Sequence, residues 1–525
     1  MLLRPGELTL DELQVIHAGG HRLLLDPLAL PSVLASAALV QRAAAGSDAV
    51  YGVNTGFGKL ASTRIDAEDL AALQRNLIRS HSVGVGAPLS PPVLRLMLAL
   101  KAASLGRGYS GVRPVVIDTL LAVHNAGLVP WIPAQGSVGA SGDLAPLSHM
   151  TLALMGEGEF NVGGARVPAG EVLAARGIAP LVLQAKEGLA LINGTQTSTA
   201  LALHALLSFE PVLESAIVIG ALTVDAARGS DGPFDPRIHA LRGQPGQIDV
   251  AMYYRLLLAG SAIRESHSEN DDRVQDPYCL RCQPQVVGAA LDQLRHAALV
   301  LVREANAVTD NPLVFPDDDS EPCNAATAGL GGVILSGGNF HAEPVALAAD
   351  AMACAIAEVG AIAERRIAML IDSNVSRLPP FLTAEPGLNS GFMIAHVTAA
   401  ALASENKSLA HPASVDSLPT SANQEDHVSM ATFAARRLQP MIANVAYILG
   451  IEWLAAAQGI QFLRPLASSE SLEQAFALLR LRCPSVEVDR HLAPDLEAAA
   501  ALVREGALSP LLRALPDVPA LWVPA

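Results

Sequence analysis

The chain has 525 residues, of which 51% are hydrophobic and 16% are charged, and its mean hydropathy is +0.34. Its formal net charge of −16 argues against nucleic-acid binding, because binding to phosphates requires a basic face. The first residues lack the charged start and apolar stretch of a signal peptide. We therefore expect a cytoplasmic protein that binds neither nucleic acid nor membrane, and whose apolar helix faces are buried in an oligomer.

Apolar residues recur at three- and four-residue spacing in several segments, which predicts α-helices. In chain order these segments are 87–105, 115–126, 195–227, 286–308, 340–372, 390–409 and 426–463. Strand patterns are short and occur at 22–25 and 160–165. Charged residues interrupt the longest apolar segments, so no uncharged apolar run of 18 residues remains to cross a bilayer. The sequence predicts an all-α fold, a bundle of long and mostly buried helices.

Glycine and proline gather between these helices, in segments whose composition is typical of loops that carry active sites. We expect one intertwined catalytic unit with three approximate parts. These are a loop-rich N-terminal lobe (1–194), a central long-helix bundle (195–464) and a C-terminal helical segment (465–525). The acidic segment from Pro316 to Gly332 is predicted to be a surface loop. The five cysteines are an odd, scattered set, and Cys279-x-x-Cys282 has no second pair, so we expect neither a disulfide framework nor a metal site.

The most informative stretch is Gly-Ser-Val-Gly-Ala-Ser-Gly-Asp-Leu-Ala-Pro-Leu at 136–147. Because Gly142 has no side chain, its backbone nitrogen can reach the carbonyl carbon of Ala140 and close a five-membered ring. Loss of the Ser141 hydroxyl as water would then leave an exocyclic methylidene. Two other glycine motifs fail here, because no lysine follows Gly142 as in a phosphate loop, and Asp143 stands where a nucleophile elbow has glycine.

These twelve residues resemble the signature of the aromatic amino acid ammonia-lyases, and the resemblance runs over nearly the full chain. It implies a 4-methylideneimidazole-5-one (MIO) electrophile built from Ala140, Ser141 and Gly142, with no external cofactor. It also implies an all-α fold of the fumarase and aspartase type. The oligomer implied is a homotetramer whose active sites are shared between subunits.

The string Tyr-Gly-Val-Asn-Thr-Gly-Phe-Gly at 51–58 matches a second family motif, and implies Tyr51 as the base that removes a β-proton. A tyrosine has a reference pKa of about 10, so we expect nearby positive charge or hydrogen-bond donors that lower the pKa of Tyr51.

The family resemblance also implies residues that hold the substrate. Arg281 would grip the carboxylate, which suits the fork of donors on a guanidinium. Tyr278 would lie near the electrophile and the amine, with Gln275 beside it. Asn193 would contact the electrophile and the carboxylate, and Phe340 would pack against the electrophile.

Selectivity is expected at two positions. The pair His81-Ser82 resembles the histidine-selective members of the family. At these two positions the phenylalanine-selective relatives carry Phe-Leu, and the tyrosine-selective relatives carry His-Leu. Glu425 stands in a Gln-Glu pair where the other lyases typically carry Asn-Gln. An imidazole substrate offers a donor and an acceptor to this pair, whereas a benzene ring would leave a buried Glu425 unpaired. Glu425 is also the second candidate for the base.

The sequence therefore predicts a lyase that converts L-histidine to trans-urocanate and ammonia. A phenylalanine or tyrosine ammonia-lyase, or an aminomutase that returns ammonia to the β-carbon, would use the same electrophile and stays an alternative. A structural or regulatory helical protein that has kept the scaffold without the chemistry is the alternative of another class.

Overall fold

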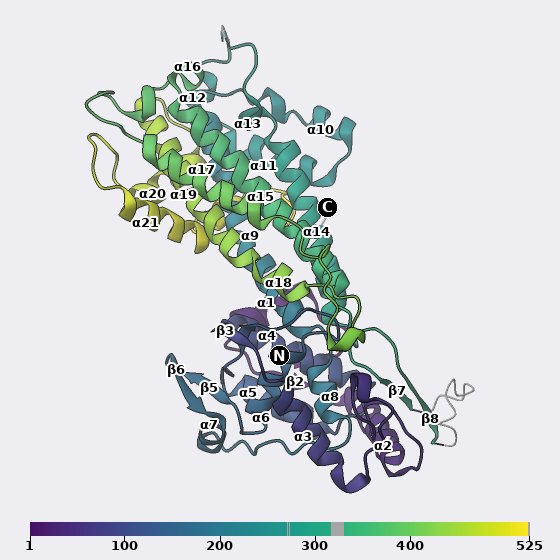
Figure 1. Ribbon diagram of the computed structural model, residues 1–525. Helices are drawn as coiled ribbons and strands as arrows, with labels where there is room; N and C mark the ends of the chain where they lie inside the picture. The colour runs from purple at the N-terminus through teal and green to yellow at the C-terminus, as the bar shows by residue number, and fades with distance from the viewer. Residues whose placement is uncertain (270, 272, 317–329, 523–525) are drawn as a thin grey trace. The chain divides into compact units, whose positions relative to one another are not determined.

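The computed structural model describes residues 1–269, 271, 273–316 and 330–522 (Figure 1). Most of the predicted loop between Pro316 and Gly332, with Cys323, lies outside these residues. The chain divides into two compact units that interleave along the sequence. Unit 1 comprises 1–204, 298–350 and 412–436, and unit 2 comprises 205–297, 351–411 and 437–525. Neither unit is a continuous segment of the chain.

Unit 1 is built around α4 (Pro91–Gly106), in which every residue from Val93 to Gly106 is buried except Arg95. Prolines at the first two positions start this helix, where the missing N–H costs nothing. The helices α1 (Leu10–Ala18) and α5 (Pro114–Asn125) pack against α4. A second group is formed by α3 (Leu70–His81), α6 (Leu144–Leu154) and α8 (Glu187–Ile192), which pack on one another. The other unit 1 helices are α2 (Leu30–Ala45), α7 (Ala169–Ala175) and α18 (Ala431–Arg436).

Unit 2 is centred on α19 (Leu438–Phe462), which is buried without interruption from Ile448 to Ile460. It packs against α17 (Met393–Leu409) and α21 (Ala493–Arg504). A buried ion pair joins Glu452 of α19 to Arg366, and Thr223 donates a hydrogen bond to the same carboxylate at 2.6 Å. The remaining helices of this unit are α10 (Pro236–Arg242), α11 (Pro245–Leu258), α12 (Ala262–Glu265), α13 (Tyr278–Arg281), α16 (Ser373–Ser376), α20 (Glu470–Arg480) and α22 (Ser509–Arg513).

Three long helices contain the boundaries between the units: α9 (Gln196–Ala226), α14 (Gln283–Ala305) and α15 (Glu343–Ile371). Within the part of the chain that the structure describes, the strands form four two-stranded sheets, of which only the first is parallel. The pairs are β1 (Leu2–Leu3) with β2 (Leu24–Leu25), β3 (Val85–Pro88) with β4 (Pro133–Gln135), β5 (Glu159–Val162) with β6 (Ala165–Pro168), and β7 (Leu313–Pro316) with β8 (Gly332–Leu335).

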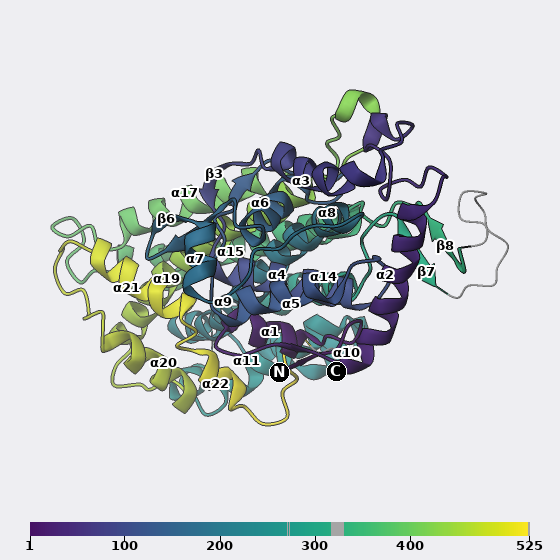
Figure 2. The same cartoon turned by 90° about the horizontal axis from the view of Figure 1, so that it is seen from below.

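The hairpin of β7 and β8 lies beside α2 in both views (Figures 1 and 2). Leu313 pairs with Leu335 and Pro316 with Gly332. Val314 packs into a small apolar cluster with Leu39 and Val40 of α2.

The predicted all-α class is confirmed, and each predicted helix is present with shifted ends. Two corrections concern helix starts. Residues 85–88 form β3, so the first predicted helix begins at Pro91 and not at 87. The segment predicted as one helix at 426–463 begins at Ala431 and is split at Arg437 into α18 and α19. The strand predicted at 160–165 is a hairpin whose turn is Gly163–Gly164.

Among the described residues, four helical segments are long and apolar enough to cross a membrane by length and composition alone. Each contains charged residues and none has an uncharged run of 18, so these segments do not contradict the expectation drawn from the sequence. They are 27–45, α9, α15 and 431–462. In the last three, 83%, 67% and 78% of the most apolar window is buried inside the protein, against 33% in 27–45. Packing within the bundle therefore accounts for most of the apolar character of these three segments.

Candidate active site

The loop that carries Ala140, Ser141 and Gly142 connects β4 to α6. Gly142 has a φ of +72°, in the left-handed region that favours glycine. It pairs with Gly194 in an isolated parallel bridge, and a Cβ atom on Gly142 would lie 2.1 Å from the carbonyl oxygen of Gly194. Any side chain at position 142 would therefore displace the backbone on both sides of this contact.

Asp143 fixes the end of the same loop. Its fully buried carboxylate accepts hydrogen bonds from the Ser198 backbone N–H at 2.7 Å, the Thr432 hydroxyl at 2.6 Å and the Ser137 hydroxyl at 2.9 Å. The backbone N–H of Asp143 donates to the carbonyl of Gly194 at 2.8 Å. Two other segments of unit 1, at 194–198 and at Thr432, are thus tied to the loop next to Ser141, while Ser137 holds the loop to itself.

Glu425 contacts the serine of the predicted electrophile. The Ser141 hydroxyl donates to Glu425 Oε1 at 3.0 Å, while Thr420 and Ser421 donate to the other carboxylate oxygen, Ser421 at 2.9 Å. On the other side of the loop, Asn193 Nδ2 donates to the backbone carbonyl of Ser141 at 3.1 Å. Asn193 Oδ1 is buried and has no hydrogen-bond partner among the described residues. This oxygen is therefore free to accept a hydrogen bond from a bound molecule.

Lys101 is a buried cation beneath this loop that the sequence analysis missed. Its Nζ donates to the backbone carbonyls of Asn193 at 2.8 Å and Ala190 at 3.2 Å. Burial lowers its pKa to about 7, opposed by the negative charges of Asp310 and Asp143. The available signal was a lone lysine within an apolar helical segment, since lysine is almost never fully buried without partners.

Tyr51 is half-buried in the loop that follows α2. Burial raises the pKa of Tyr51 and the charge of Glu425 raises it further, while a hydrogen bond with the backbone of Gly58 lowers it. The expectation that neighbouring groups would lower this pKa was wrong for the chain by itself. The physical reason is first that burial disfavours the charged phenolate, and second that the charged neighbour acting on Tyr51 is a carboxylate and not a cation.

His81 is the last residue of α3. Its Nδ1 donates to the carbonyl of Leu77 at 2.9 Å, which leaves Nε2 free to accept. Burial lowers the pKa of His81, while the Leu77 carbonyl and the charge of Glu425 oppose this shift. The imidazole is therefore biased toward its neutral form. The charge of Glu425 raises the pKa of both Tyr51 and His81.

Phe340 is half-buried in the turn between β8 and α15. This turn is attached to the loop of Ser141, because the N–H of Ala342 donates to the carbonyl of Gly139 at 3.2 Å. Unit 1 therefore contains eight of the predicted site residues. They are Tyr51, His81, Ala140, Ser141, Gly142, Asn193, Phe340 and Glu425.

Gln275, Tyr278 and Arg281 lie in unit 2, in the segment that leads into and forms α13. The Arg281 guanidinium carbon is 4.6 Å from the centre of the Tyr278 ring, a cation–π contact, and Arg281 Nε donates to the carbonyl of Asp276 at 3.0 Å. Gln275 is exposed, and the Tyr278 side chain is 71% exposed in the single chain. Within unit 2 these three predicted residues therefore form one group, in which Gln275 and Tyr278 are exposed and Arg281 is half-buried.

The chain is similar to known proteins over almost its whole length. A model of the aromatic amino acid lyase family matches residues 8–481. A protein of Rhodospirillum rubrum named histidine ammonia-lyase is 62% identical over 513 residues, covering 98% of this chain and 97% of the relative. A relative of the same name from Aromatoleum aromaticum is 60% identical, covering 97% of this chain and 94% of its own.

Solved structures give the same result. A histidine ammonia-lyase of Trypanosoma cruzi is 41% identical with a TM-score of 0.88, covering 99% of this chain and 96% of its own. A tyrosine aminomutase of Streptomyces globisporus is 34% identical with a TM-score of 0.90, covering 99% of both chains. Members of the matched family use the protein-derived MIO group. The chain belongs to the aromatic amino acid lyase family and is a carbon–nitrogen lyase.

Proposed function

We propose that the chain eliminates ammonia from L-histidine to give trans-urocanate. The observation that carries this proposal is the contact of Glu425 with Ser141 at 3.0 Å, which sets a carboxylate of the predicted selectivity pair against the residue expected to form the electrophile. The names of the relatives at 62% and 60% identity support the same substrate.

The residues around Gly142 fit the MIO group. The left-handed φ of Gly142 and its approach to Gly194 form a backbone cradle that a Cβ would fill. Asn193 donates to the carbonyl of Ser141 on one side of this cradle, and Lys101 donates to the carbonyl of Asn193 on the other. The MIO group would supply an electrophilic carbon that takes up the substrate amine and makes it a leaving group.

Glu425 has a role that changes when Ser141 loses its hydroxyl. In the unmodified chain, Glu425 Oε1 accepts from that hydroxyl. Dehydration of Ser141 removes the donor and leaves Oε1 to accept from the N–H of an imidazole ring. Neutral His81, with Nε2 free, complements the same ring. A phenyl ring offers neither group, and a site of this kind rejects such a ring by several orders of magnitude.

We propose that Tyr51 removes the β-proton and that Arg281 binds the substrate carboxylate in an active site shared between subunits of a homotetramer. The raised pKa of Tyr51 makes it a poor base in the single chain. A cation contributed on assembly would lower this pKa. The exposure of Gln275 and Tyr278 beside Arg281 supports a role for this group at a subunit interface. We also propose a cytoplasmic location.

The MIO proposal is tested by intact mass. The wild-type chain should weigh two water molecules less than its sequence, because ring closure and serine dehydration each remove one. Ser141→Ala should keep the oligomer and lose most activity. An active wild-type preparation with the full sequence mass would refute the MIO proposal.

Substrate choice is tested by kcat/KM for histidine, phenylalanine and tyrosine on the wild type and on the double variant His81→Phe, Glu425→Gln. The wild type should strongly prefer histidine, and the double variant should lose histidine turnover far more than any residual phenylalanine turnover. A wild type that prefers another ring, or an unchanged preference in the variant, would contradict the assignment. Product analysis separates a lyase from the aminomutase alternative, since an aminomutase yields a β-amino acid.

Subunit sharing is tested by mixing two inactive proteins, Tyr51→Phe and Arg281→Ala, under conditions that exchange subunits. If each site takes Tyr51 and Arg281 from different subunits, mixed oligomers contain sites with both wild-type residues and regain activity. If one subunit supplies both residues, the mixture stays inactive. Each unmixed variant, treated identically, is the control.

A further inference from the structure

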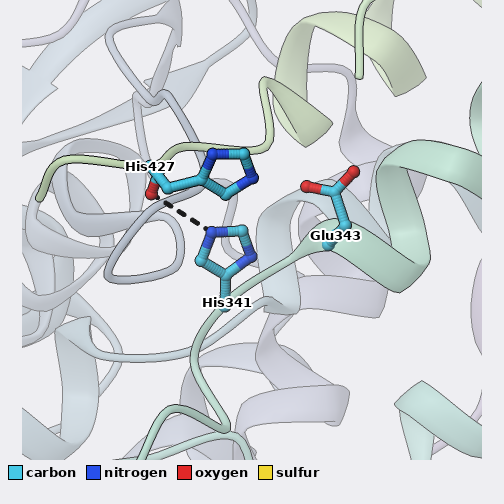
Figure 3. A group of neighbouring side chains, drawn as sticks. All are labelled: His341, Glu343 and His427. Carbon is cyan, nitrogen blue, oxygen red and sulfur yellow. Dashed lines mark hydrogen bonds between the residues drawn. The ribbon is translucent and has the colours of Figure 1, made fainter. Parts of the chain in front are cut away.

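Three side chains outside the proposed substrate site gather in unit 1 (Figure 3). They are His341, Glu343 and His427. One potential ligand atom from each residue lies within 4.8 Å of the other two. Glu343 is the first residue of α15 and His341 lies just before it, whereas His427 comes from the segment before α18. The cluster therefore links the stretch that follows Phe340 to the stretch that follows Glu425.

The two imidazoles are arranged with one nitrogen available on each ring. His341 Nε2 lies 3.2 Å from the backbone carbonyl oxygen of His427, and because a carbonyl can only accept, Nε2 carries the hydrogen. The lone pair of His341 is therefore on Nδ1. Figure 3 shows one nitrogen of each ring on the side of the Glu343 carboxylate. A second-sphere hydrogen bond of this kind, from the far nitrogen to a backbone carbonyl, is typical of metal-binding histidines.

Glu343 supplies a carboxylate oxygen that the protein leaves unsatisfied. Its Oε2 is buried and has no hydrogen-bond partner among the described residues. A buried carboxylate oxygen without a donor costs free energy that a nearby cation would recover.

We propose that His341, Glu343 and His427 form a binding site for a divalent transition-metal ion such as Zn²⁺. Two histidines and one glutamate are an established zinc ligand set, completed by water in the fourth position. Zinc ligands in a tetrahedral site lie roughly 3.4 Å apart. The three donors must therefore approach one another by up to about 1.4 Å, which would take rotations of more than one side chain, with His427 exposed and free of close packing on its solvent side. The bound ion would clamp the start of α15 to the segment before α18.

The test is binding of Zn²⁺ and Co²⁺ to the chelator-treated full chain, and it does not depend on the lyase activity. Calorimetry should find a saturable site for one Zn²⁺ per chain. Cobalt should give the visible bands of nitrogen and oxygen ligation without the near-ultraviolet band of thiolate ligation, which would instead indicate the cysteines. Glu343→Gln and His427→Ala should each weaken binding at least tenfold.

His21→Ala is the matched control, because His21 is exposed and lies outside the cluster. It should bind Zn²⁺ like the wild type. His427→Ala keeps the test decisive if Glu343→Gln fails to fold, since His427 is exposed. Absence of saturable binding, a thiolate band with cobalt, or equal affinity in His427→Ala and wild type would overturn the proposal while leaving the proposed lyase function intact.

Discussion

Replacing Gly142 by alanine separates the conformational requirement of the electrophile loop from its chemistry. At a φ of +72° an alanine costs about 1–2 kcal/mol relative to glycine. The new Cβ would also lie 2.1 Å from the Gly194 carbonyl oxygen and 2.4 Å from its carbonyl carbon, against 3.4–4 Å in ordinary contacts. These are backbone atoms that cannot rotate away, and overpacking of this kind adds about 1–3 kcal/mol. We expect Gly142→Ala to lower the free energy of unfolding by about 2–5 kcal/mol.

Gly127→Ala is the matched control. Gly127 also has a left-handed φ, +64°, but a Cβ there meets no atom within 4 Å. It should cost only the conformational part, about 1–2 kcal/mol. The assay is urea denaturation together with intact mass. Gly127→Ala should still lose two water molecules, whereas Gly142→Ala should keep the full sequence mass. Equal denaturation midpoints, or a Gly142→Ala chain that has lost both waters, would refute the reasoning.

Three further predictions concern single side chains. Tyr51→Phe should lower kcat by orders of magnitude with the MIO mass unchanged, and near-normal kcat would move the role of base to Glu425. Arg281→Lys should raise KM and lower kcat together, because an ammonium cannot reproduce the guanidinium fork; steady-state kinetics with unchanged KM would contradict the carboxylate contact. Because the pKa of Lys101 is about 7 in the folded chain and 10.5 ordinarily, the unfolded chain binds more protons between these values. The free energy of unfolding of the wild type should therefore increase relative to that of Lys101→Met as the pH rises from about 7 toward 10.5. If the urea midpoints of the two proteins instead changed in parallel over this range, Lys101 would not be a buried titrating group.

Short sequence motifs predicted those candidate site residues that lie within a single loop. The motifs around Tyr51, Ser141 and Asn193 identified residues that the structure gathers in unit 1, because each string encodes its own loop. The long helices followed from apolar spacing, but their ends did not. The helix predicted from 426 begins only at Ala431, because the Met430 N–H donates to the carbonyl of Val138 and the Ser429 hydroxyl donates to the carbonyl of Gly139.

Features made by contacts between distant segments could not be predicted. Lys101 reaches the carbonyl of a residue 92 positions later, and His341 and His427 are 86 positions apart. No periodicity relates such positions. The expected direction of the Tyr51 pKa shift was likewise wrong, because the shift depends first on how deeply the fold buries the phenol and then on which charge it brings near, and the motif encodes neither.

The interleaved order of the two units has a consequence for biosynthesis. Ser141 and Asp143 receive partners from Glu425 and Thr432, which lie 284 and 289 residues further along the chain. A ribosome must therefore release most of the polypeptide before the loop of Ser141 acquires its full set of contacts. Self-modification at Ala140-Ser141-Gly142 would then be a late event, and prematurely terminated fragments would carry the signature without the geometry to mature it.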